Sequence, residues 1–199
     1  MNNNKCIYLI RHGEAEHNIN YLKYGSKTFY DKNYIDTKLT QKGHEQSINL
    51  HNSWNNINDI ELVLVSPLYR TLQTATNIFK DNNIPILAIE DLREHPNTCH
   101  TCNKRKNKTE LVKNFPNINF DNIINNKDNI WNDNIEESID SLELRINNIK
   151  NLIKTFNYKN ICIVGHNSFI SQMLYKKILL LDNNDKEIKH CFPYKINKI

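Results

Sequence analysis

The feature that most constrains the fold is a set of four short, continuously apolar runs separated by longer polar segments. The runs are CIYLI (6–10), ELVLV (61–65), PILAI (85–89) and NICIVG (160–165). Strands buried on both faces read as unbroken hydrophobic stretches of this length, because neither face meets water. The four runs therefore predict the buried strands of one central sheet.

Segments with helical signals lie between these runs. Residues 39–54 have Thr40 as a candidate N-cap, the residue whose side chain satisfies the first free amides of a helix. Residues 66–79 place Ser66 at the N-cap and Pro67 at the first helical position, where a missing amide hydrogen costs nothing. Both segments are predicted to be helices.

Two further helices are predicted in the second half of the chain. Residues 138–156 repeat apolar side chains at spacings of three and four, which places them on one helix face. These side chains are Ile139, Leu142, Ile146, Ile149, Ile153 and Phe156. The last helix follows His166, with an apolar face formed by Ile170, Met173, Leu174 and Ile178.

Strands that alternate with helices predict an α/β fold, a three-layer α/β/α sandwich with a mostly parallel central sheet. A length of 199 residues fits one domain spanning residues 1–199. Residues 95–135 break the alternation and are expected to be an insertion that covers a sheet edge and overhangs the site. The final residues, CFPYKINKI (191–199), are expected to add one edge strand.

Composition limits the class of protein. The net charge of +4 is too small to indicate nucleic-acid binding but suits an anionic small molecule. No apolar stretch approaches the roughly 20 residues that cross a bilayer, and the polar start MNNNKCIYLI does not resemble a signal peptide. Five irregularly spaced Cys, two of them in apolar runs, indicate free thiols. We therefore expect a cytoplasmic protein, and the sequence does not define its oligomeric state.

The residues that follow the four predicted strands are chemically related. Arg11 and His12 follow the first strand, Arg70 lies one turn into the helix after the second, Glu94 comes after the third, and His166 follows the fourth. In open α/β sheets ligands bind at the carboxyl ends of the strands, so these side chains are expected to converge on one rim.

This set of side chains suits phosphoryl transfer. Guanidinium groups match phosphate oxygens in charge and geometry. A neutral imidazole is a competent nucleophile near neutral pH, and a carboxylic acid can protonate the leaving alkoxide and then activate water. The chemistry requires no metal and no cofactor, so none is expected.

At this point the sequence resembles a known family. The stretches that carry the resemblance, in chain order, are RHGEAEHN (11–18), DTKLTQKG (36–43), SPLYRTLQTA (66–75), LRE (92–94) and VGHNSFI (164–170). They are similar to the motifs of the histidine phosphatase superfamily, the phosphoglycerate mutase-like proteins. CNKR (102–105), followed by FPNINF and DNIW, further resembles a plant and fungal phosphoglycerate mutase-like branch.

The resemblance implies a role for each matching residue. His12 would be the nucleophile that carries a phosphohistidine intermediate, and Glu94 would be the general acid and then the base for water. Three residues would clamp the phosphoryl oxygens, and Asn18 matches a further phosphate-contacting position. The three clamping residues are Arg11, Arg70 and His166. Gly13 would let a backbone carbonyl fix the tautomer of His12.

Two residues are predicted to bind substrate on weaker grounds. Asn167 departs from the commoner Ser or Gly after the second His, and its amide would either donate to phosphate or crowd the turn. Arg105, or a neighbouring Lys of the basic run 104–108, would meet distal anionic groups of the substrate. Cys99 and Cys102 have metal-ligand spacing, with two His nearby, but lack the second ligand pair of a structural zinc site, so a loop with two thiols is expected.

The function predicted is a metal-independent phosphomonoesterase, of the histidine acid phosphatase type, that acts on a small phosphorylated metabolite. Two alternatives stay open at this level. One is phosphoryl transfer of the phosphoglycerate mutase type, and the other is a non-catalytic module that binds a phosphorylated ligand.

Overall fold

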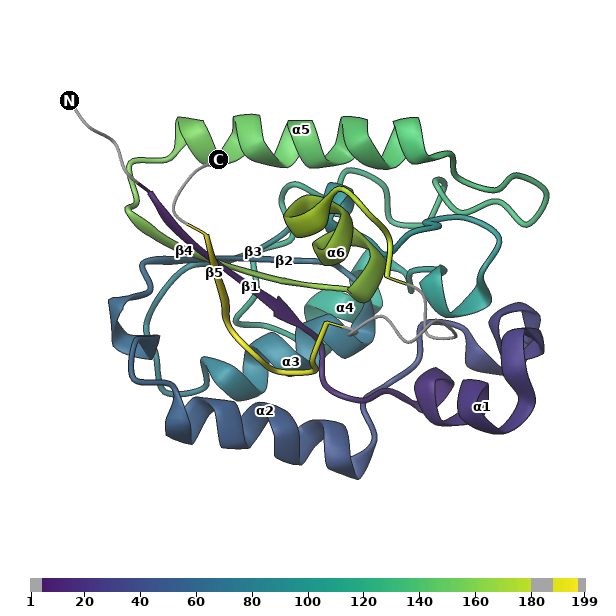
Figure 1. Ribbon diagram of the computed structural model, residues 1–199, viewed down its shortest axis with the longest axis horizontal. Helices are drawn as coiled ribbons and strands as arrows, with labels where there is room; N and C mark the ends of the chain where they lie inside the picture. The colour runs from purple at the N-terminus through teal and green to yellow at the C-terminus, as the bar shows by residue number, and fades with distance from the viewer. Residues whose placement is uncertain (1–4, 180–187, 197–199) are drawn as a thin grey trace.

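A computed structural model describes residues 5–179 and 188–196 of the chain (Figure 1). Its centre is a five-stranded sheet with the order β3-β2-β4-β1-β5. The strands are β1 (Cys6–Arg11), β2 (Leu62–Val65), β3 (Ile86–Ala88), β4 (Asn160–Gly165) and β5 (Tyr194–Ile196). The first four are parallel and β5 runs antiparallel to β1. The four predicted buried strands and the predicted C-terminal edge strand are all present.

Helices cover both faces of the sheet, with α2 and α5 on opposite sides in Figure 1. The α-helices are α1 (Glu16–Tyr24), α2 (Gln41–Ser53), α3 (Tyr69–Ile78), α4 (Lys108–Asn114), α5 (Ile139–Thr155) and α6 (Asn167–Tyr175). Short 3-10 helices are η1 (Gly25–Tyr30), η2 (Lys32–Tyr34), η3 (Ile57–Asp59), η4 (Glu90–Leu92) and η5 (Thr101–Asn103).

The alternation of side chains along β1 explains the three layers. Tyr8 and Ile10 belong to the core shared with α2, α3 and α4, whereas Ile7 and Leu9 belong to the core shared with α5 and α6. Successive residues of a strand point to opposite faces, so an unbroken apolar run supplies both cores at once. The predicted α/β/α sandwich is thereby confirmed.

Side-chain capping starts two of the α-helices, α2 and α5. The Thr40 hydroxyl accepts from the Gly43 amide at 3.0 Å, as predicted for the N-cap of α2. The predicted cap of α3 is wrong: the helix begins at Tyr69 with Leu68 at the N-cap. The reason is that the Ser66 amide donates to the Val164 carbonyl and so continues the sheet ladder, which delays the helix by two residues.

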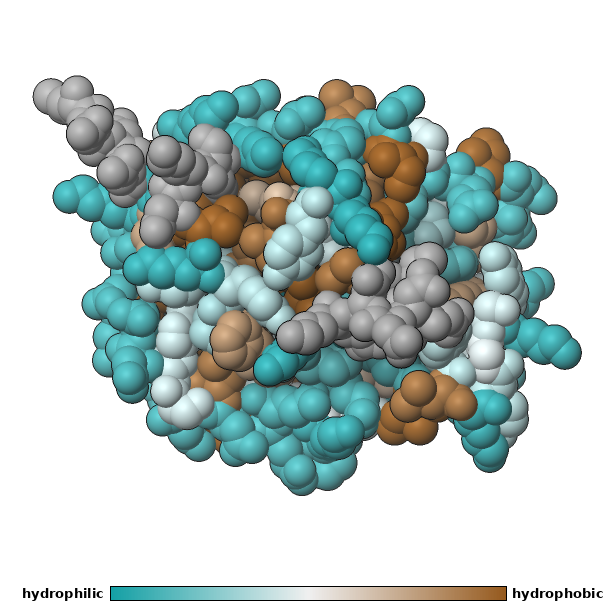
Figure 2. All heavy atoms as spheres, viewed as in Figure 1, coloured by the Kyte–Doolittle hydropathy of each residue, from teal (hydrophilic) through white to brown (hydrophobic). Residues whose placement is uncertain are grey.

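The predicted apolar faces of the last two helices are mostly correct. Leu142, Ile146, Ile149 and Ile153 of α5 are buried against the sheet, but Ile139 in its first turn is 47% exposed. Figure 2 shows one face of the molecule, where hydrophobic residues are separated by hydrophilic ones. In α6, Ile170 and Met173 are buried and Leu174 packs at the edge of the core, whereas Ile178 lies beyond the helix.

Residues 95–135 contain η5 and α4 and reach the free edge of β3. The Asn119 amide donates to Ile86 O at 2.8 Å, and the Ala88 amide donates to Asn119 O at 2.9 Å. Behind this contact Arg93 is fully buried and pairs with Asp128 at 2.8 Å. The segment thus satisfies backbone groups that an edge strand would otherwise expose.

Candidate active site

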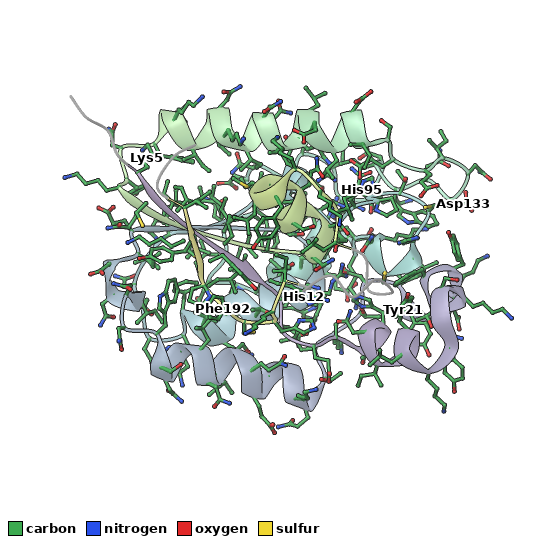
Figure 3. The ribbon with its side chains drawn as sticks, viewed as in Figure 1. Lys5, His12, Tyr21, His95, Asp133 and Phe192 are labelled. Carbon is green, nitrogen blue, oxygen red and sulfur yellow. The ribbon has the colours of Figure 1, made fainter. Side chains whose placement is uncertain are left out.

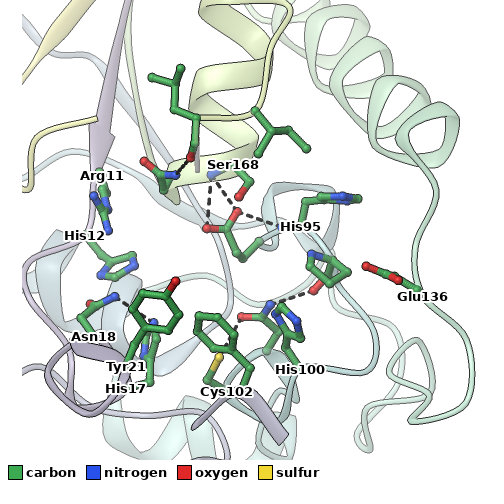
Figure 4. Close-up of a pocket in the computed structure, with 17 residues that line it drawn as sticks. Arg11, His12, His17, Asn18, Tyr21, His95, His100, Cys102, Glu136 and Ser168 are labelled. Atoms are coloured by element: carbon green, nitrogen blue, oxygen red, sulfur yellow. Dashed lines mark hydrogen bonds between the residues drawn. The ribbon is translucent and has the colours of Figure 1, made fainter. Parts of the chain in front are cut away.

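The predicted site residues gather at the carboxyl ends of the parallel strands. Figure 3 places His12, Tyr21 and His95 at this end of the molecule, and Lys5 at the opposite end of β1. A cavity of about 290 Å³ opens there. Its lining includes Arg11, His12 and Glu94, together with side chains from α1, η1, η5 and the start of α6 (Figure 4).

His12 directly follows β1, and its contacts fix its tautomer. Nδ1 lies 2.7 Å from the carbonyl oxygen of Gly13, and a carbonyl only accepts, so Nδ1 carries the proton. Nε2 therefore holds the lone pair, and the Nε–H of Arg70 donates to it at 3.3 Å. The ring nitrogen that faces Arg70 with its lone pair is thus defined before any ligand arrives.

Both predicted guanidinium groups lie in the site. Arg70 is 1% exposed, and its two terminal nitrogens donate to Cys102 O at 2.7 Å and Asn103 Oδ1 at 2.8 Å. Arg11 is also buried, lines the cavity and donates to Ile188 O at 2.8 Å. Two positive charges with little access to water make this end of the cavity attractive to a dianion.

His166 follows β4 and caps α6. Its ring centroid is 5.2 Å from that of His12, and its Nε2 lies 2.8 Å from the hydroxyl oxygen of Ser66. Its Nδ1 is buried and has no hydrogen-bond partner among the residues the structure describes. A buried imidazole nitrogen without a partner beside a nucleophile is a candidate ligand contact.

Glu94 lies on the other side of the cavity, against the start of α6. Oε1 accepts from the amides of His95, Ser168 and Phe169 at 2.8, 3.1 and 3.2 Å, whereas Oε2 has one longer contact, 3.3 Å, to Ser168 (Figure 4). Oε2 is therefore the oxygen with capacity left for a proton.

Gly13 is required by a close approach of two backbone segments. A Cβ at Gly13 would lie 2.4 Å from the carbonyl oxygen of Gly43, and a Cβ at Gly43 would lie 2.0 Å from Glu14 O. The Gly13 amide also donates to the Thr74 hydroxyl at 3.1 Å. The DTKLTQKG stretch thus supports the loop that carries His12 and does not enter the cavity itself.

The two predicted asparagines differ in what their side chains do. Asn18 lines the cavity, accepts from the Ala15 amide at 2.9 Å and lies 3.2 Å from Nε2 of His17. Asn167 also lines the cavity, but its amide donates to Leu179 O at 2.7 Å and its oxygen accepts from Ile188 at 3.3 Å. Its side chain therefore ties down the chain after α6, so the predicted phosphate donation is not what its contacts support.

The prediction for Arg105 is corrected by the structure. Its side chain is fully buried outside the cavity, donates to Glu90 Oε1 at 2.9 Å and contacts several backbone carbonyls. A guanidinium has five N–H donors and can therefore bind several backbone carbonyls of one loop. Arg105 has this structural role here. The sequence could not distinguish an overhanging cation from one that is turned inward.

The Cys pair also lies in this segment. Cys99 is half-buried, and Cys102 is buried at the cavity wall, where desolvation raises its pKa to about 11. Among residues 5–179 and 188–196, no cluster of three or more His, Cys, Asp or Glu is arranged to hold a metal ion. Within the same residues, no helix has the length and apolar character to traverse a bilayer.

Three residues near His12 were not singled out from the sequence. His17 and His190 place their rings 6.0 and 5.6 Å from that of His12, and His190 Nδ1 contacts His12 O at 2.5 Å. Asn103 joins Arg70 to Pro96 O. His17 lies within RHGEAEHN, which could have drawn attention to it, but nothing in the local sequence marks His190.

The imidazoles around His12 are held neutral by their surroundings. Burial, reinforced by the Arg70 guanidinium, lowers the pKa of His12 and of His166 well below the usual value near 6.5. Burial and the nearby Arg70 lower the pKa of His17 in the same way, and burial lowers the pKa of His190 to about 4. At neutral pH the positive charge of the site therefore resides on the two arginines.

Comparison with known protein families agrees with this geometry. A model of the histidine phosphatase superfamily (branch 1) matches residues 7–194. The chain therefore belongs to the histidine phosphatase superfamily.

Individual relatives carry phosphatase or mutase-like names. Phosphoglycerate mutase-like protein 1 of Arabidopsis thaliana is 30% identical over 201 residues, covering 85% of this chain and 71% of that protein. The adenosylcobalamin/alpha-ribazole phosphatase of Escherichia coli is 36% identical over 88 residues, 44% of this chain and 39% of its own length. A solved structure of a putative alpha-ribazole-5'-P phosphatase from Escherichia coli superposes with a TM-score of 0.59 at 25% identity, over 87% of this chain and 79% of that one.

Proposed function

We propose that the protein is a phosphomonoesterase that works through a phosphohistidine at His12. The observation that carries this proposal is the fixed tautomer of His12, with Nδ1–H held by the Gly13 carbonyl and the Nε2 lone pair beside the Arg70 guanidinium. The family and the phosphatase names among its members support the reaction class.

In the first step Nε2 of His12 attacks phosphorus, a new N–P bond forms and the ester P–O bond breaks. The leaving oxygen takes the proton that Glu94 carries on Oε2, so the alcohol departs neutral. The charge that spreads over the phosphoryl oxygens is met by Arg11, by the Nε–H of Arg70 and by a donor on His166. When the Ser66 hydroxyl donates to Nε2 of His166, the ring proton resides on Nδ1. Nδ1, which has no hydrogen-bond partner among the described residues, is then the donor that meets the phosphoryl oxygens.

In the second step water attacks the phosphohistidine. Glu94, now ionised, takes a proton from the water as its oxygen bonds to phosphorus. The N–P bond breaks, its electron pair returns to Nε2, and inorganic phosphate leaves. Both enzyme groups are then in their starting protonation states, so the cycle closes without a metal or cofactor in any step.

The test is phosphate release from p-nitrophenyl phosphate in buffer containing a chelator, together with trapping of the phosphoenzyme. We expect turnover, inhibition by vanadate, and a rapid-quench label from ³²P-phosphorylated substrate that is stable in alkali and labile in acid. His12→Ala should lose both turnover and label, whereas His51→Ala, whose imidazole binds Ile78 O far from the site, should keep both. Turnover that survives in His12→Ala would contradict the mechanism.

A further inference from the structure

The outer part of the cavity has a wall of three rings, which we call the aromatic row: Tyr21, Phe29 and His100. The centroids of Tyr21 and Phe29 are 5.0 Å apart with planes 20° from parallel, and those of Phe29 and His100 are 4.6 Å apart at 17°. All three rings line the cavity and are only half-buried, so they retain surface that a ligand can cover. In Figure 4, Tyr21 and His100 lie along the side opposite Ser168.

The rest of this outer part adds apolar surface. Pro96, Ile178 and Leu179 also line the cavity. Burial lowers the pKa of His100 to about 4, so its ring is uncharged at neutral pH and adds a third ring to the stack. A cavity of about 290 Å³ lies at the lower end of the size range of small-molecule sites. The cavity therefore accepts a phosphoryl group and one compact substituent.

The basic residues 104–106, which were candidates for binding an anionic substituent of the substrate, do not line the cavity. Lys104 lies over the ring of Trp131, with Nζ 4.2 Å from the centroid, and Lys106 pairs with Glu110 at 2.7 Å. Arg105 forms an ion pair with Glu90. Among the lining residues that the structure describes, Arg11 at the inner end is the one guanidinium or ammonium group, and Glu136 lines the cavity opposite it (Figure 4).

We propose that the substrate is a small phosphomonoester whose alcohol carries a flat aromatic ring without an anionic substituent, and that the aromatic row packs against this ring. The proposal rests on the phosphatase activity proposed above and specifies its substrate class. Ring-to-ring packing stabilises the bound alcohol moiety beyond the area it buries. Among the described lining residues, a carboxylate in the same place would meet Glu136 and no cation, so a phosphorylated sugar acid is disfavoured.

The experiment compares three phosphates: 2-phenylethyl phosphate, hexyl phosphate and 3-phosphoglycerate. The first two have alcohols of similar basicity, so leaving-group chemistry does not bias their kcat/KM ratio. We expect 2-phenylethyl phosphate to exceed hexyl phosphate by about fivefold, as one aromatic pair provides, and to exceed 3-phosphoglycerate by more. A ratio of one, or a preference for 3-phosphoglycerate, would overturn the proposal.

Substitutions in α1 and η1 test whether the aromatic row causes this preference. Tyr21→Leu keeps apolar bulk but removes the ring, so the phenylethyl-to-hexyl ratio should fall toward one, and Phe29→Leu should act in the same direction. Tyr21→Phe keeps the ring and should retain the ratio. The matched control is Tyr24→Leu, also on α1, where the side chain is 54% exposed and does not line the cavity. An unchanged ratio in both Leu variants of the row would contradict the assignment.

A binding measurement separates this proposal from the proposed function. Calorimetry with 3-phenylpropylphosphonate and heptylphosphonate, which cannot be hydrolysed, reports ring preference without turnover. Tighter binding of the phenyl compound that is lost in Tyr21→Leu would support the aromatic row, whether or not any ester is hydrolysed. Absence of hydrolysis would contradict the phosphatase proposal and leave the binding result in place. Equal binding of the two phosphonates would overturn the aromatic row while leaving any observed hydrolysis in place.

Discussion

The inner end of the cavity, around Arg11 and His12, is built from strand ends, whereas its outer end is built from loops and short helices. At the inner end, β1, β2 and β4 lead directly into His12, Ser66 and His166, and the parallel sheet determines their separation. At the outer end, the rings come from α1, η1 and the approach to η5, three segments with no shared sheet register.

The two ends also differ in what they offer a ligand. The inner end supplies guanidinium groups and neutral imidazoles, which are suited to a phosphoryl group of any ester. The outer end supplies rings and apolar side chains and turns its neighbouring cations away. Under the two proposals, the sheet ends would determine the reaction type and the loops the choice of substrate, so substitutions at the two ends should have separable effects.

The largest expected effect is that of Glu94→Gln at the inner end. Loss of the proton donor should lower kcat for hexyl phosphate by about 10²–10⁴-fold. It should lower kcat for p-nitrophenyl phosphate much less, because nitrophenolate leaves without a proton. Steady-state kinetics on both substrates provide the measurement, with exposed Glu45→Gln as the control. Equal losses on both substrates would assign Glu94 to holding the start of α6.

Arg70→Lys should come next, because this side chain joins the two ends. A lysine keeps the charge but cannot reproduce the contacts of the guanidinium to Cys102 O and Asn103 Oδ1. We expect kcat/KM to fall by about 10²–10³-fold, and the phenylethyl-to-hexyl ratio to fall as well, since η5 loses its anchor. If the ratio stays at the wild-type value while activity drops, the two ends are independent.

Arg105→Met should affect stability and leave chemistry intact. Removing the guanidinium takes the nearer of its two cationic partners from the largely buried Glu90 carboxylate and leaves Arg93 at 3.6 Å, which costs about 3 kcal/mol. A chain of this size should then melt about 10 °C lower, with kcat at low temperature unchanged. Lys104→Met, which removes an exposed cation–π contact, should shift Tm far less. A raised KM without a lower Tm would restore Arg105 to substrate binding.

The smallest effect is a pH dependence of stability. His12, His17, His166 and His190 have lower pKa values in the folded protein than the value near 6.5 of the unfolded chain. The unfolded chain therefore takes up protons first as pH falls from about 6.5 toward 4, so acid favours unfolding in this window. His100, with its pKa lowered to about 4 by burial, adds to this trend. Asp36, with its pKa raised to about 6 by burial, and Glu90, whose pKa burial also raises, oppose it, but they are two groups against five.

Differential scanning calorimetry between pH 7.5 and 5 checks this prediction. We expect Tm to fall by several degrees, which corresponds to a loss of about 1–2 kcal/mol in the free energy of unfolding. Because burial holds the pKa of His12 well below its usual value near 6.5, activity of the folded protein should fall less on acidification than it would with an exposed imidazole. A Tm that rises on acidification would show that the Asp36 carboxyl dominates.

The inner end could be predicted from the sequence because it depends on local patterns. An apolar run followed by a polar residue fixes a strand end, and parallel strands bring their ends together, so His12, Glu94 and His166 could be assigned to one rim. The role of Gly13 was implied by the family resemblance, and its close approach to Gly43 emerged only from the structure. The α3 cap at Ser66 was wrong because a tertiary contact, the ladder bond to Val164, overrode a local signal.

The outer end could not be predicted for the opposite reason. Whether Arg105 faces the cavity or Glu90 depends on the path of a loop that no periodicity describes. The pairing of Phe29 with His100 joins residues 71 positions apart whose spacing follows no element. His190 reaches His12 from the far end of the chain through a single hydrogen bond, which leaves no trace in the local sequence.

The hydrogen bonds between Arg70 and residues 102–103 have a consequence for how this protein could change over evolutionary time. A segment held by a buried guanidinium is not a lid that swings, since opening it would break both bonds and leave their partners unsatisfied. New substrate preferences would therefore arise by exchanging side chains on a fixed frame. The aromatic row is then the part of the molecule that is free to diversify, while the guanidinium that anchors it stays constant.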